Sequence, residues 1–416
     1  MTYRKSQPKV ISLYSGAGGL DYGFEAAGFE TVFANDLDHD SCETLRLNRE
    51  WPVVERSIFD VPTEEILETA GARTGDIDVL IGGPPCQPFS KSSYWVRGDA
   101  GRLNDPRAAT LDAYLRVLEE VRPRAFLLEN VYGIAYSEKN EGMQLLLNKI
   151  AAINRRRGTR YQPKAAVLNA AWFGVPQLRE RFFLVGARDG SSFDFPAPTF
   201  APPSASQQAL GTLPSYRTAW DAIADVRPSP DEDLEVRGKW AGLLPSIPEG
   251  QNYLHHTDRG GGMPLFGWRR RYWNFLLKLA KRLPSWTIQA QPGPSVGPFH
   301  WENRRLSHRE LCRLQTFPDD VHVYGKRASM QRQVGNAVPS LLAEVLARAI
   351  KVQLLGYRRT KEPLHLLPPD RSPAPPPERV RSVPDEYRNL AGPHHAHPGT
   401  GKGPRSMQQQ SDELFI

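Results

Sequence analysis

One cysteine in the chain stands where a nucleophile could be held in a fixed position. Cys86 comes directly after Pro84 and Pro85, which follow two glycines and the apolar residues 79–81. The glycines permit a sharp turn off a buried strand, and the prolines restrict the backbone before the thiol. Such restriction suits a nucleophile, because it must be held near its target atom. The alternative is an inert buried cysteine in a proline-rich turn, so Cys86 alone favours a nucleophile only modestly.

Further polar side chains flank two other apolar runs. Glu129 follows the apolar residues 125–128, where the end of a parallel strand would face a ligand crevice. Burial there would raise its pKa and make it a usable acid. Gln177, Arg179 and Arg181 alternate along an extended segment, which predicts that they share one face. The alternatives are a strand-end acid satisfied by a helix N-terminus and a row of structural salt bridges.

A glycine-rich turn near the N-terminus predicts a ligand site. Residues 15–20 read Ser-Gly-Ala-Gly-Gly-Leu and lie between a predicted strand and a predicted helix, where backbone can approach a ligand. A tight turn without a ligand explains the glycines equally well. Asp36 follows about 20 residues later, where an acid can accept from ribose hydroxyls. Asp38 and Asp40 compete for that role, and one of these two is expected to cap a helix. The pattern predicts a nucleoside ligand and does not separate a hydride carrier from a methyl donor.

Strand-like and helical segments alternate over the first half of the chain. This order predicts an α/β fold: a Rossmann-like, mostly parallel sheet with helices on both faces. The predicted strands are residues 9–14, 31–34, 76–81, 124–128 and 182–186. The predicted helices are residues 20–27, 41–48, 108–120 and 143–154, with further helical periodicity at 307–314 and 338–355.

Composition divides the rest of the chain. Residues 194–215 are rich in Pro, Ala and Ser, and the last 60 residues contain 11 prolines. We therefore expect a smaller irregular domain and a disordered tail, with a short ordered segment around residues 380–390. The expected domains are 1–193 for the main α/β domain, 194–299 for the smaller one, 300–356 for a return segment and 357–416 for the tail.

Bulk properties exclude several classes of protein. The 416 residues contain no apolar run near the roughly 20 residues that span a bilayer. Three scattered cysteines exclude a disulfide framework and a cysteine-based zinc site, and they suit a reducing cytoplasm. The net charge of +7, from 53 basic and 46 acidic residues, permits a polyanionic partner without requiring one.

Basic and aromatic residues are concentrated between residues 266 and 283. This strip has six basic residues, five aromatic residues and no acid. It suits contact with phosphates and bases. An amphipathic helix is an alternative, because Phe275, Leu276, Leu279 and Leu283 follow helical spacing, and both readings can hold together.

Taken in order, these motifs resemble those of DNA cytosine-5 methyltransferases of the bacterial restriction–modification type. The similarity extends over about residues 10–350. The matching segments are the cofactor loop at 12–24, Gly83–Ser90 around the nucleophile, Glu129-Asn130-Val131, Gln177-x-Arg179-x-Arg181, residues 305–318, and the closing motif Gln333-Val-Gly-Asn336-Ala-Val-Pro339.

The resemblance implies a role for each motif. Cys86 would add to carbon 6 of cytosine, Glu129 would act at ring N3, Arg181 would hold O2, and Arg179 would support it. The cofactor would be S-adenosylmethionine, bound by Tyr14, Ser15, Gly16, Ala17, Gly18, Gly19, Leu20, Asp36, Leu37, Ile58, Pro84, Asn336, Ala337 and Val338. DNA would be bound by Gln87, Ser90, Arg269, Arg270 and Arg271, the arginines lying in a target-recognition domain at 194–299. No metal is implied.

The resemblance also implies the setting of the reaction. The partner would be double-stranded DNA carrying a short target sequence, and the target base would be flipped out of the duplex. We expect a bacterial, cytoplasmic monomer that protects host DNA. A restriction endonuclease would act on the same DNA site but need not bind this protein.

Two positions depart from the family pattern. The usual ribose-binding glutamate is Asp36, and the usual Gly-Asp-Ile is Arg56-Ser57-Ile58, which leaves open whether Asp60 replaces the missing acid. Three rival functions remain: a tRNA cytosine-5 methyltransferase on the same fold, a glycine-loop dehydrogenase, and a catalytically silent DNA-binding module.

Overall fold

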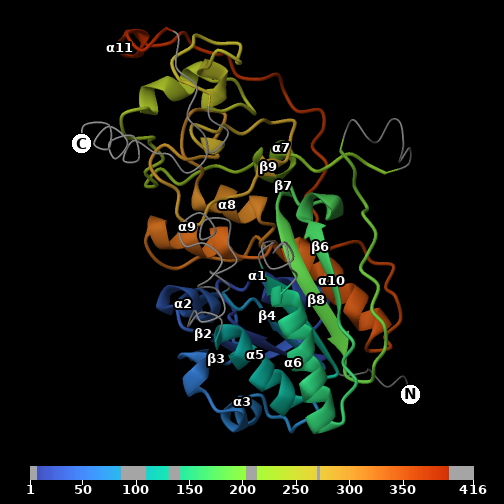
Figure 1. The fold of residues 1–416 in the computed structure, drawn as a ribbon. Coiled ribbons are helices and arrows are strands. Elements are labelled where there is room, and N and C mark those ends of the chain that lie inside the picture. Colours follow the sequence, from blue (N-terminus) through green and yellow to red (C-terminus); the bar gives the residue numbers. More distant parts are fainter. Residues whose placement is uncertain (1–6, 86–108, 131–140, 203–212, 269–271, 393–416) are drawn as a thin grey trace, which may run out of the picture. The chain divides into compact units, whose positions relative to one another are not determined.

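The structure is a computed structural model that describes residues 7–85, 109–130, 141–202, 213–268 and 272–392 (Figure 1). The chain divides into two compact units. Unit 1 comprises Met1–Pro228, Arg282–Gln291 and Ser307–Ser372, and unit 2 comprises Ser229–Lys281, Pro292–Leu306 and Pro373–Ile416. Within the described ranges, no helix has the length and apolarity that crossing a membrane requires.

Unit 1 is built on a seven-stranded sheet with the order β3-β2-β1-β4-β5-β8-β6. All neighbouring pairs from β3 to β5 are parallel, whereas β8 runs antiparallel to both β5 and β6. The mostly parallel sheet predicted from the sequence is therefore confirmed. The strands are β1 (Lys9–Leu13), β2 (Glu30–Asp36), β3 (Val53–Glu55), β4 (Val79–Gly82), β5 (Ala125–Asn130), β6 (Lys164–Asn169) and β8 (Glu180–Ala187).

Alternate residues of each central strand enter two separate cores, one on each face of the sheet. In β4, Val79 and Ile81 belong to one core, while Leu80 belongs to the other. The first core includes Phe24 of α1 (Gly19–Ala26) and Leu346 of α10 (Ser340–Gln353). The second includes side chains from the helices on the opposite face: α3 (Thr63–Thr69), α5 (Ala109–Val121) and α6 (Glu141–Arg157). Helices cover both faces (Figure 1), as strands buried on both sides require.

Shorter elements complete unit 1. Two strands of the seven-stranded sheet escaped the sequence prediction: β3 has only three residues, and β6 begins with exposed residues. The remaining elements are α2 (His39–Asn48), η1 (Ile58–Asp60), η6 (Ala170–Phe173), α7 (Ala219–Ile223), α8 (His308–Leu314) and α9 (Arg327–Asn336), with the separate parallel pair β7 (Gln177–Leu178) and β9 (Ser285–Trp286).

Unit 2 consists of short turns around one core. Its described elements are η7 (Ala241–Ser246), η8 (Tyr253–His256) and α11 (Asp385–Arg388). Leucine, isoleucine and aromatic side chains from distant segments form the core, and Val383 and Tyr387 of the C-terminal segment are among them. Residues 373–392 thus pack as part of unit 2, while the domain boundaries expected from the sequence stay predictions.

The alternative of an amphipathic helix at 266–283 is wrong for the described residues 272–283. Leu276 has a φ of 52°, which interrupts a right-handed helix. Backbone N–H groups there donate to distant carbonyls instead of to residues one turn earlier: Leu276 to Ser295, Lys278 to Gln251, and Leu279 to Phe299. Pairing with other segments therefore overrides the local spacing.

Candidate active site

A pocket of about 490 Å³ lies in unit 1 at the carboxyl ends of the parallel strands. This is the edge of an α/β sheet where ligands usually bind. Residues from the turn after β1, the end of β2, the segment after β3, the end of β4 and the end of β5 all line it. From the expected cofactor set, the lining includes Tyr14, Ser15, Gly16, Ala17, Gly19, Leu20, Asp36, Leu37, Ile58, Pro84, Asn336, Ala337 and Val338. Gly18 is buried beside the pocket and is not part of its lining.

The glycine turn between β1 and α1 is tied to Asp36. Gly16 has a φ of 54°, and its backbone N–H donates to Asp36 Oδ2 at 2.8 Å. Asp36 Oδ1 accepts from the backbone N–H of Asp38 at 2.9 Å. Burial raises the pKa of the Asp36 carboxyl, and these backbone N–H groups oppose that rise. The turn therefore carries a desolvated carboxylate directly beside its backbone.

The three aspartates after β2 have different roles. Asp38 is the helix cap, because its side chain accepts from the backbone N–H of Ser41 at the start of α2. It also pairs with Arg332 at 2.7 Å, and this partner lowers its pKa against the opposing effect of burial. Asp40 lies in the first turn of α2 and does not line the pocket, and neither does the exposed Asp60.

Glu129 and Arg181 form an ion pair in the same pocket. β5 and β8 are antiparallel neighbours, which brings the end of β5 beside the start of β8. Arg181 Nε lies 3.0 Å from Glu129 Oε1, and the two side chains are only 15% and 12% exposed. Burial raises the pKa of Glu129, and the guanidinium of Arg181 opposes that rise. A carboxyl in this setting can hold a proton for a ligand.

Gly83 allows this carboxyl to reach the pocket. A Cβ atom at Gly83 would lie 2.8 Å from Glu129 Oε2, closer than van der Waals contact permits. The glycine after β4 is therefore needed for the approach of Glu129, in addition to any role in turning the chain.

Arg179 and Gln177 face the protein interior. Arg179 is 1% exposed, and its guanidinium donates to the carbonyls of Gly335 at 2.7 Å and Ile288 at 3.4 Å. Gln177 is fully buried and donates to the carbonyl of Leu314. Neither residue lines the pocket. They join β7 and β8 to the returning segments that carry the closing motif.

The closing motif supplies one wall of the pocket. Asn336 is the last residue of α9, and Ala337 and Val338 follow it before α10. Gln315 donates to the carbonyl of Val334 at 2.7 Å, which fixes the end of α9 against α8. The residues at the end of α9 and just after it thus line the same pocket as the glycine turn.

The expected nucleophile and the expected DNA contacts lie outside the described residues. These are Cys86, Gln87, Ser90, Arg269, Arg270 and Arg271. The backbone immediately before Cys86 is described, and Pro84 and Pro85 both line the pocket. Asn130 Nδ2 donates to the carbonyl of Pro84 at 3.1 Å, which joins this segment to the end of β5.

Sequence reasoning missed five pocket residues: Asn35, Ser41, Phe59, Thr110 and Arg332. Thr110 lies in α5, Phe59 lies in η1 and is 54% exposed, and Arg332 lies in α9. Arg332 is separated from its partner Asp38 by 294 residues. The only local signal was its position one residue before the closing motif.

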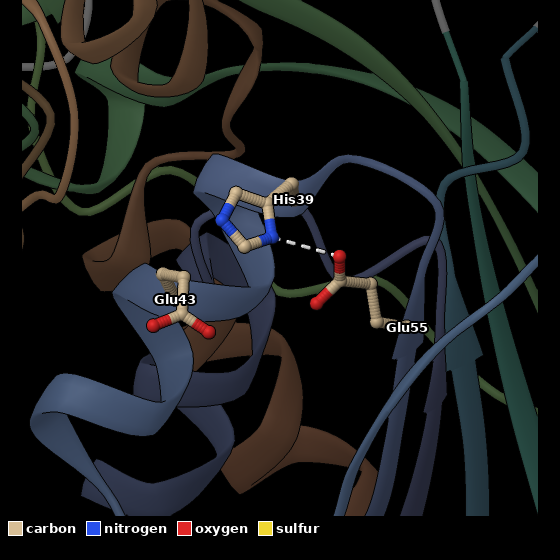
Figure 2. Close-up of side chains that lie close together, drawn as sticks. All are labelled: His39, Glu43 and Glu55. Atoms are coloured by element: carbon tan, nitrogen blue, oxygen red, sulfur yellow. Dashed lines mark hydrogen bonds and ion pairs between the residues drawn. The ribbon is translucent and has the colours of Figure 1, made fainter.

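A separate cluster near the start of α2 contains His39, Glu43 and Glu55 (Figure 2). His39 Nδ1 lies 2.8 Å from Glu55 Oε1, and this carboxylate raises the pKa of the exposed imidazole. Arg46 Nη1 lies 2.7 Å from Glu43 and 2.6 Å from Glu55, so both carboxylates already have a cationic partner. The cluster is a surface ion-pair network, and we assign no metal to it.

Comparison with known proteins agrees with this geometry. Residues 8–352 match the family of C-5 cytosine-specific DNA methylases. The chain therefore belongs to the C-5 cytosine-specific DNA methylase family.

Two curated relatives and one solved structure illustrate the likeness. The Type II methyltransferase M.SacI of Streptomyces achromogenes is 41% identical over 374 residues, covering 84% of this chain and 93% of the relative. M.NgoFVII of Neisseria gonorrhoeae, also a Type II methyltransferase, is 35% identical over 83% of this chain and 87% of its own. A prophage-encoded methyltransferase of E. coli shares the fold, with a TM-score of 0.59, 22% identity, and coverage of 84% and 100%. The chain is thus a C-5 cytosine-specific DNA methyltransferase.

Proposed function

We propose that the protein methylates carbon 5 of one cytosine within a short duplex DNA sequence, through a covalent adduct of Cys86. The observation that carries this proposal is one pocket of unit 1 in which the glycine turn with Asp36, the Glu129–Arg181 pair and the two prolines before Cys86 all meet. A nucleoside site and a proton-holding carboxyl are thereby adjacent.

The pocket residues fit S-adenosylmethionine. The volume of about 490 Å³ suits a ligand of this size. Asp36 offers a carboxylate for ribose hydroxyls, while Leu37 and Ile58 offer apolar surface for a purine. Asn336 is exposed in the pocket wall and is available for the polar end of the ligand. Bound there, S-adenosylmethionine supplies an electrophilic methyl group on sulfur.

The chain's own residues activate the cytosine. Cys86, as a thiolate, adds to carbon 6, which makes carbon 5 nucleophilic. Glu129 delivers a proton or hydrogen bond to ring N3, so that negative charge does not accumulate on the ring. Arg181 holds Glu129 in place and stabilises the charge that develops at O2. After a methyl–carbon bond forms at carbon 5, the carbon 5 proton leaves to a base and Cys86 is expelled as the ring double bond returns.

This chemistry needs the base outside the helix. Ring carbon 6 is inaccessible in a stacked duplex, so the target cytosine is flipped into the pocket. Arg269, Arg270 and Arg271 are proposed to contact phosphates or guanine edges, since arginine pairs bidentately with guanine. The protein acts as a monomer in the bacterial cytoplasm and protects host DNA from an endonuclease that reads the same site.

The test is transfer of labelled methyl groups from S-adenosylmethionine to unmethylated bacterial DNA, followed by bisulfite sequencing. Methylated cytosines confined to one short motif are the expected result. A duplex carrying 5-fluorocytosine at that motif should then remain covalently attached to the protein under denaturing conditions, because fluorine cannot leave as the proton does.

The control is Cys86→Ser, which should abolish both methyl transfer and the covalent complex. Activity that survives this change would reject the adduct mechanism. Label on tRNA instead of DNA would move the substrate to RNA. Hydride transfer from a nicotinamide would indicate a dehydrogenase, and specific DNA binding without any transfer would indicate a silent binding protein.

A further inference from the structure

Two hydrogen bonds connect the glycine turn with the residue before Cys86. Tyr14 Oη donates to the backbone carbonyl of Thr110 at 2.7 Å, and Thr110 Oγ1 donates to the carbonyl of Pro85 at 3.0 Å. Tyr14 directly precedes the glycine turn, and all three residues line the pocket. We call this connection the Tyr14–Thr110–Pro85 chain.

The backbone of Tyr14 is held in an unusual conformation. Its φ of 55° lies in the left-handed region, which a bulky residue adopts only when its surroundings enforce it. The next two residues supply that constraint, because Ser15 N donates to Asn35 O at 3.0 Å and Gly16 N donates to Asp36. Burial raises the pKa of the Tyr14 phenol, so its hydroxyl stays protonated and remains a donor.

The two prolines are held from different elements. Asn130, at the end of β5, donates to the Pro84 carbonyl, whereas the Pro85 carbonyl is bound by Thr110 from α5. The sheet therefore orients Pro84, and Pro85 is bound to a helix residue that Tyr14 contacts. Pro85 is thus linked through Thr110 to Tyr14, the residue that precedes the glycine turn.

We propose that Tyr14 is a positioning residue that couples occupation of the pocket to the placement of Pro85, and through it of the Cys86 thiol. A ligand that contacts the glycine turn restrains Tyr14, and the chain transmits this restraint to the residue bonded to Cys86. The effect matters because displacements of about 1 Å strongly lower the rate of a reaction that depends on orientation. The inference rests on the proposed function, which makes this pocket the cofactor site.

The test measures the reactivity of Cys86 with and without bound cofactor product. Iodoacetamide alkylation is followed by peptide mass spectrometry, in the absence and presence of saturating S-adenosylhomocysteine. Cys42 and Cys312 are buried thiols and serve as internal references. In the wild type, S-adenosylhomocysteine should change the Cys86 rate by about 3- to 10-fold, the range that one net hydrogen bond controls. In Tyr14→Phe, which keeps the ring and removes only the hydroxyl, this ratio should approach unity.

Rate measurements give a second readout. Tyr14→Phe and Thr110→Val should each lower single-turnover methyl transfer by about 3- to 10-fold, with less than about a twofold change in cofactor affinity. The double variant should lose no more than the worse single variant, since both changes interrupt the same connection. Thr110→Ser keeps the hydroxyl and should restore the rate.

Tyr161→Phe is the matched control. Tyr161 is buried, and its hydroxyl also donates to a backbone carbonyl at 2.7 Å, that of Pro123. It does not line the pocket. This variant should lose a similar amount of stability and keep both the wild-type alkylation ratio and the wild-type rate.

The outcomes separate the inference from the proposed function. Calorimetry that detects no S-adenosylhomocysteine binding to the wild type rejects the cofactor assignment and the inference together. Normal binding with an unchanged alkylation ratio in Tyr14→Phe rejects the inference alone. Three other results would also reject the inference alone. They are an alkylation ratio of unity in the wild type, additive losses of methyl-transfer rate in the double variant, and variants that weaken cofactor affinity without lowering the rate.

Discussion

Unit 1 and unit 2 are stabilised in different ways. In unit 1, regular strands and helices divide side chains between two cores on opposite faces of a sheet. In the described part of unit 2, short turns surround aromatic rings from distant segments, such as Trp240 with Phe266, Phe275 and Tyr387. Periodicity reveals burial in unit 1 because position within an element decides it. No local sequence pattern indicates the packing of unit 2, because its contacts join distant segments.

The two units also use buried ion pairs differently. In unit 1, the Glu129–Arg181 pair lines the pocket. In unit 2, Lys281 is enclosed, with Nζ 2.8 Å from Glu249 and 2.7 Å from Glu378. Lys281 therefore joins residues 249 and 378 across unit 2. The pair in unit 1 faces a pocket, whereas the pairs in unit 2 join two segments of that unit.

The largest expected effect comes from the pair in unit 1. Glu129→Ala removes the proposed acid and leaves Arg181 without its partner, so the methyl-transfer rate should fall about 10²- to 10⁴-fold. Cofactor binding, measured by calorimetry, should persist. Asp112→Ala, which removes an exposed partner of Lys149, is the control and should leave the rate unchanged.

The pH profile sharpens this prediction. Burial raises the pKa of Glu129, so its protonated form persists to higher pH than in an exposed glutamate. The methyl-transfer rate should decline as the pH rises through that raised pKa. A rate that is independent of pH in this range, or a fully active Glu129→Ala variant, would exclude Glu129 as the acid.

The corresponding change in unit 2 is Lys281→Met. It removes the cation that lies 2.8 Å from the buried Glu249 and should lower the stability of unit 2 by about 3–5 kcal/mol. Limited proteolysis should cleave unit 2 while calorimetry still detects cofactor binding to unit 1. Arg237→Met, at exposed pairs with Asp233 and Glu235, should cost less than about 1 kcal/mol. Equal losses of stability in Lys281→Met and Arg237→Met would contradict the distinction between buried and exposed ion pairs.

Tyr387→Ala tests whether the C-terminal segment belongs to unit 2. The Tyr387 ring stacks on Trp240 with centroids 5.8 Å apart, and its hydroxyl donates to the carbonyl of Lys239. Removing the ring should cost about 3 kcal/mol in the free energy of unfolding, measured by denaturant titration. Tyr387→Phe removes only the hydrogen bond and should cost about 1 kcal/mol. A cost near zero for Tyr387→Ala would mean that this segment does not stabilise the unit.

The smallest expected effect concerns Asp21, a buried acidic residue of unit 1. Asp21 is fully buried, and within the described residues neither carboxylate oxygen has a hydrogen-bond partner. Burial raises its pKa to about 7. A raised pKa means that the folded state binds the proton more tightly than the unfolded state. The contribution of Asp21 to the free energy of unfolding is therefore fully present below about pH 4 and is lost as the pH rises through about 7.

Asp21→Asn should remove this dependence. The loss in wild-type stability between about pH 5 and pH 7, on the order of 2 kcal/mol, should disappear in the variant. Thermal unfolding across this range is the measurement. Parallel pH profiles for the two proteins would show that Asp21 is not the group responsible.

The sequence alone determined the alternation of the main strands and helices, the glycine turn and the carboxyl at the end of β5. These follow from local rules, because a strand buried on both faces must be apolar and a tight turn needs glycine. The main strands at β1, β4 and β5 and the helices α1, α5 and α10 were predicted on that basis. The roles of Cys86 and of the arginine strip stay predictions, since these residues lie outside the described ranges.

Only the tertiary structure decided which polar residues meet. Arg181 and Arg179 are equivalent in sequence spacing, yet one pairs with Glu129 and the other binds two backbone carbonyls. The Asp38–Arg332 pair joins residues far apart in the chain. The irregular unit 2, including residues 373–392, was equally hidden, because its contacts depend on segments brought together by folding. Local periodicity specifies how each element is buried, whereas the partners of a side chain depend on how distant elements pack.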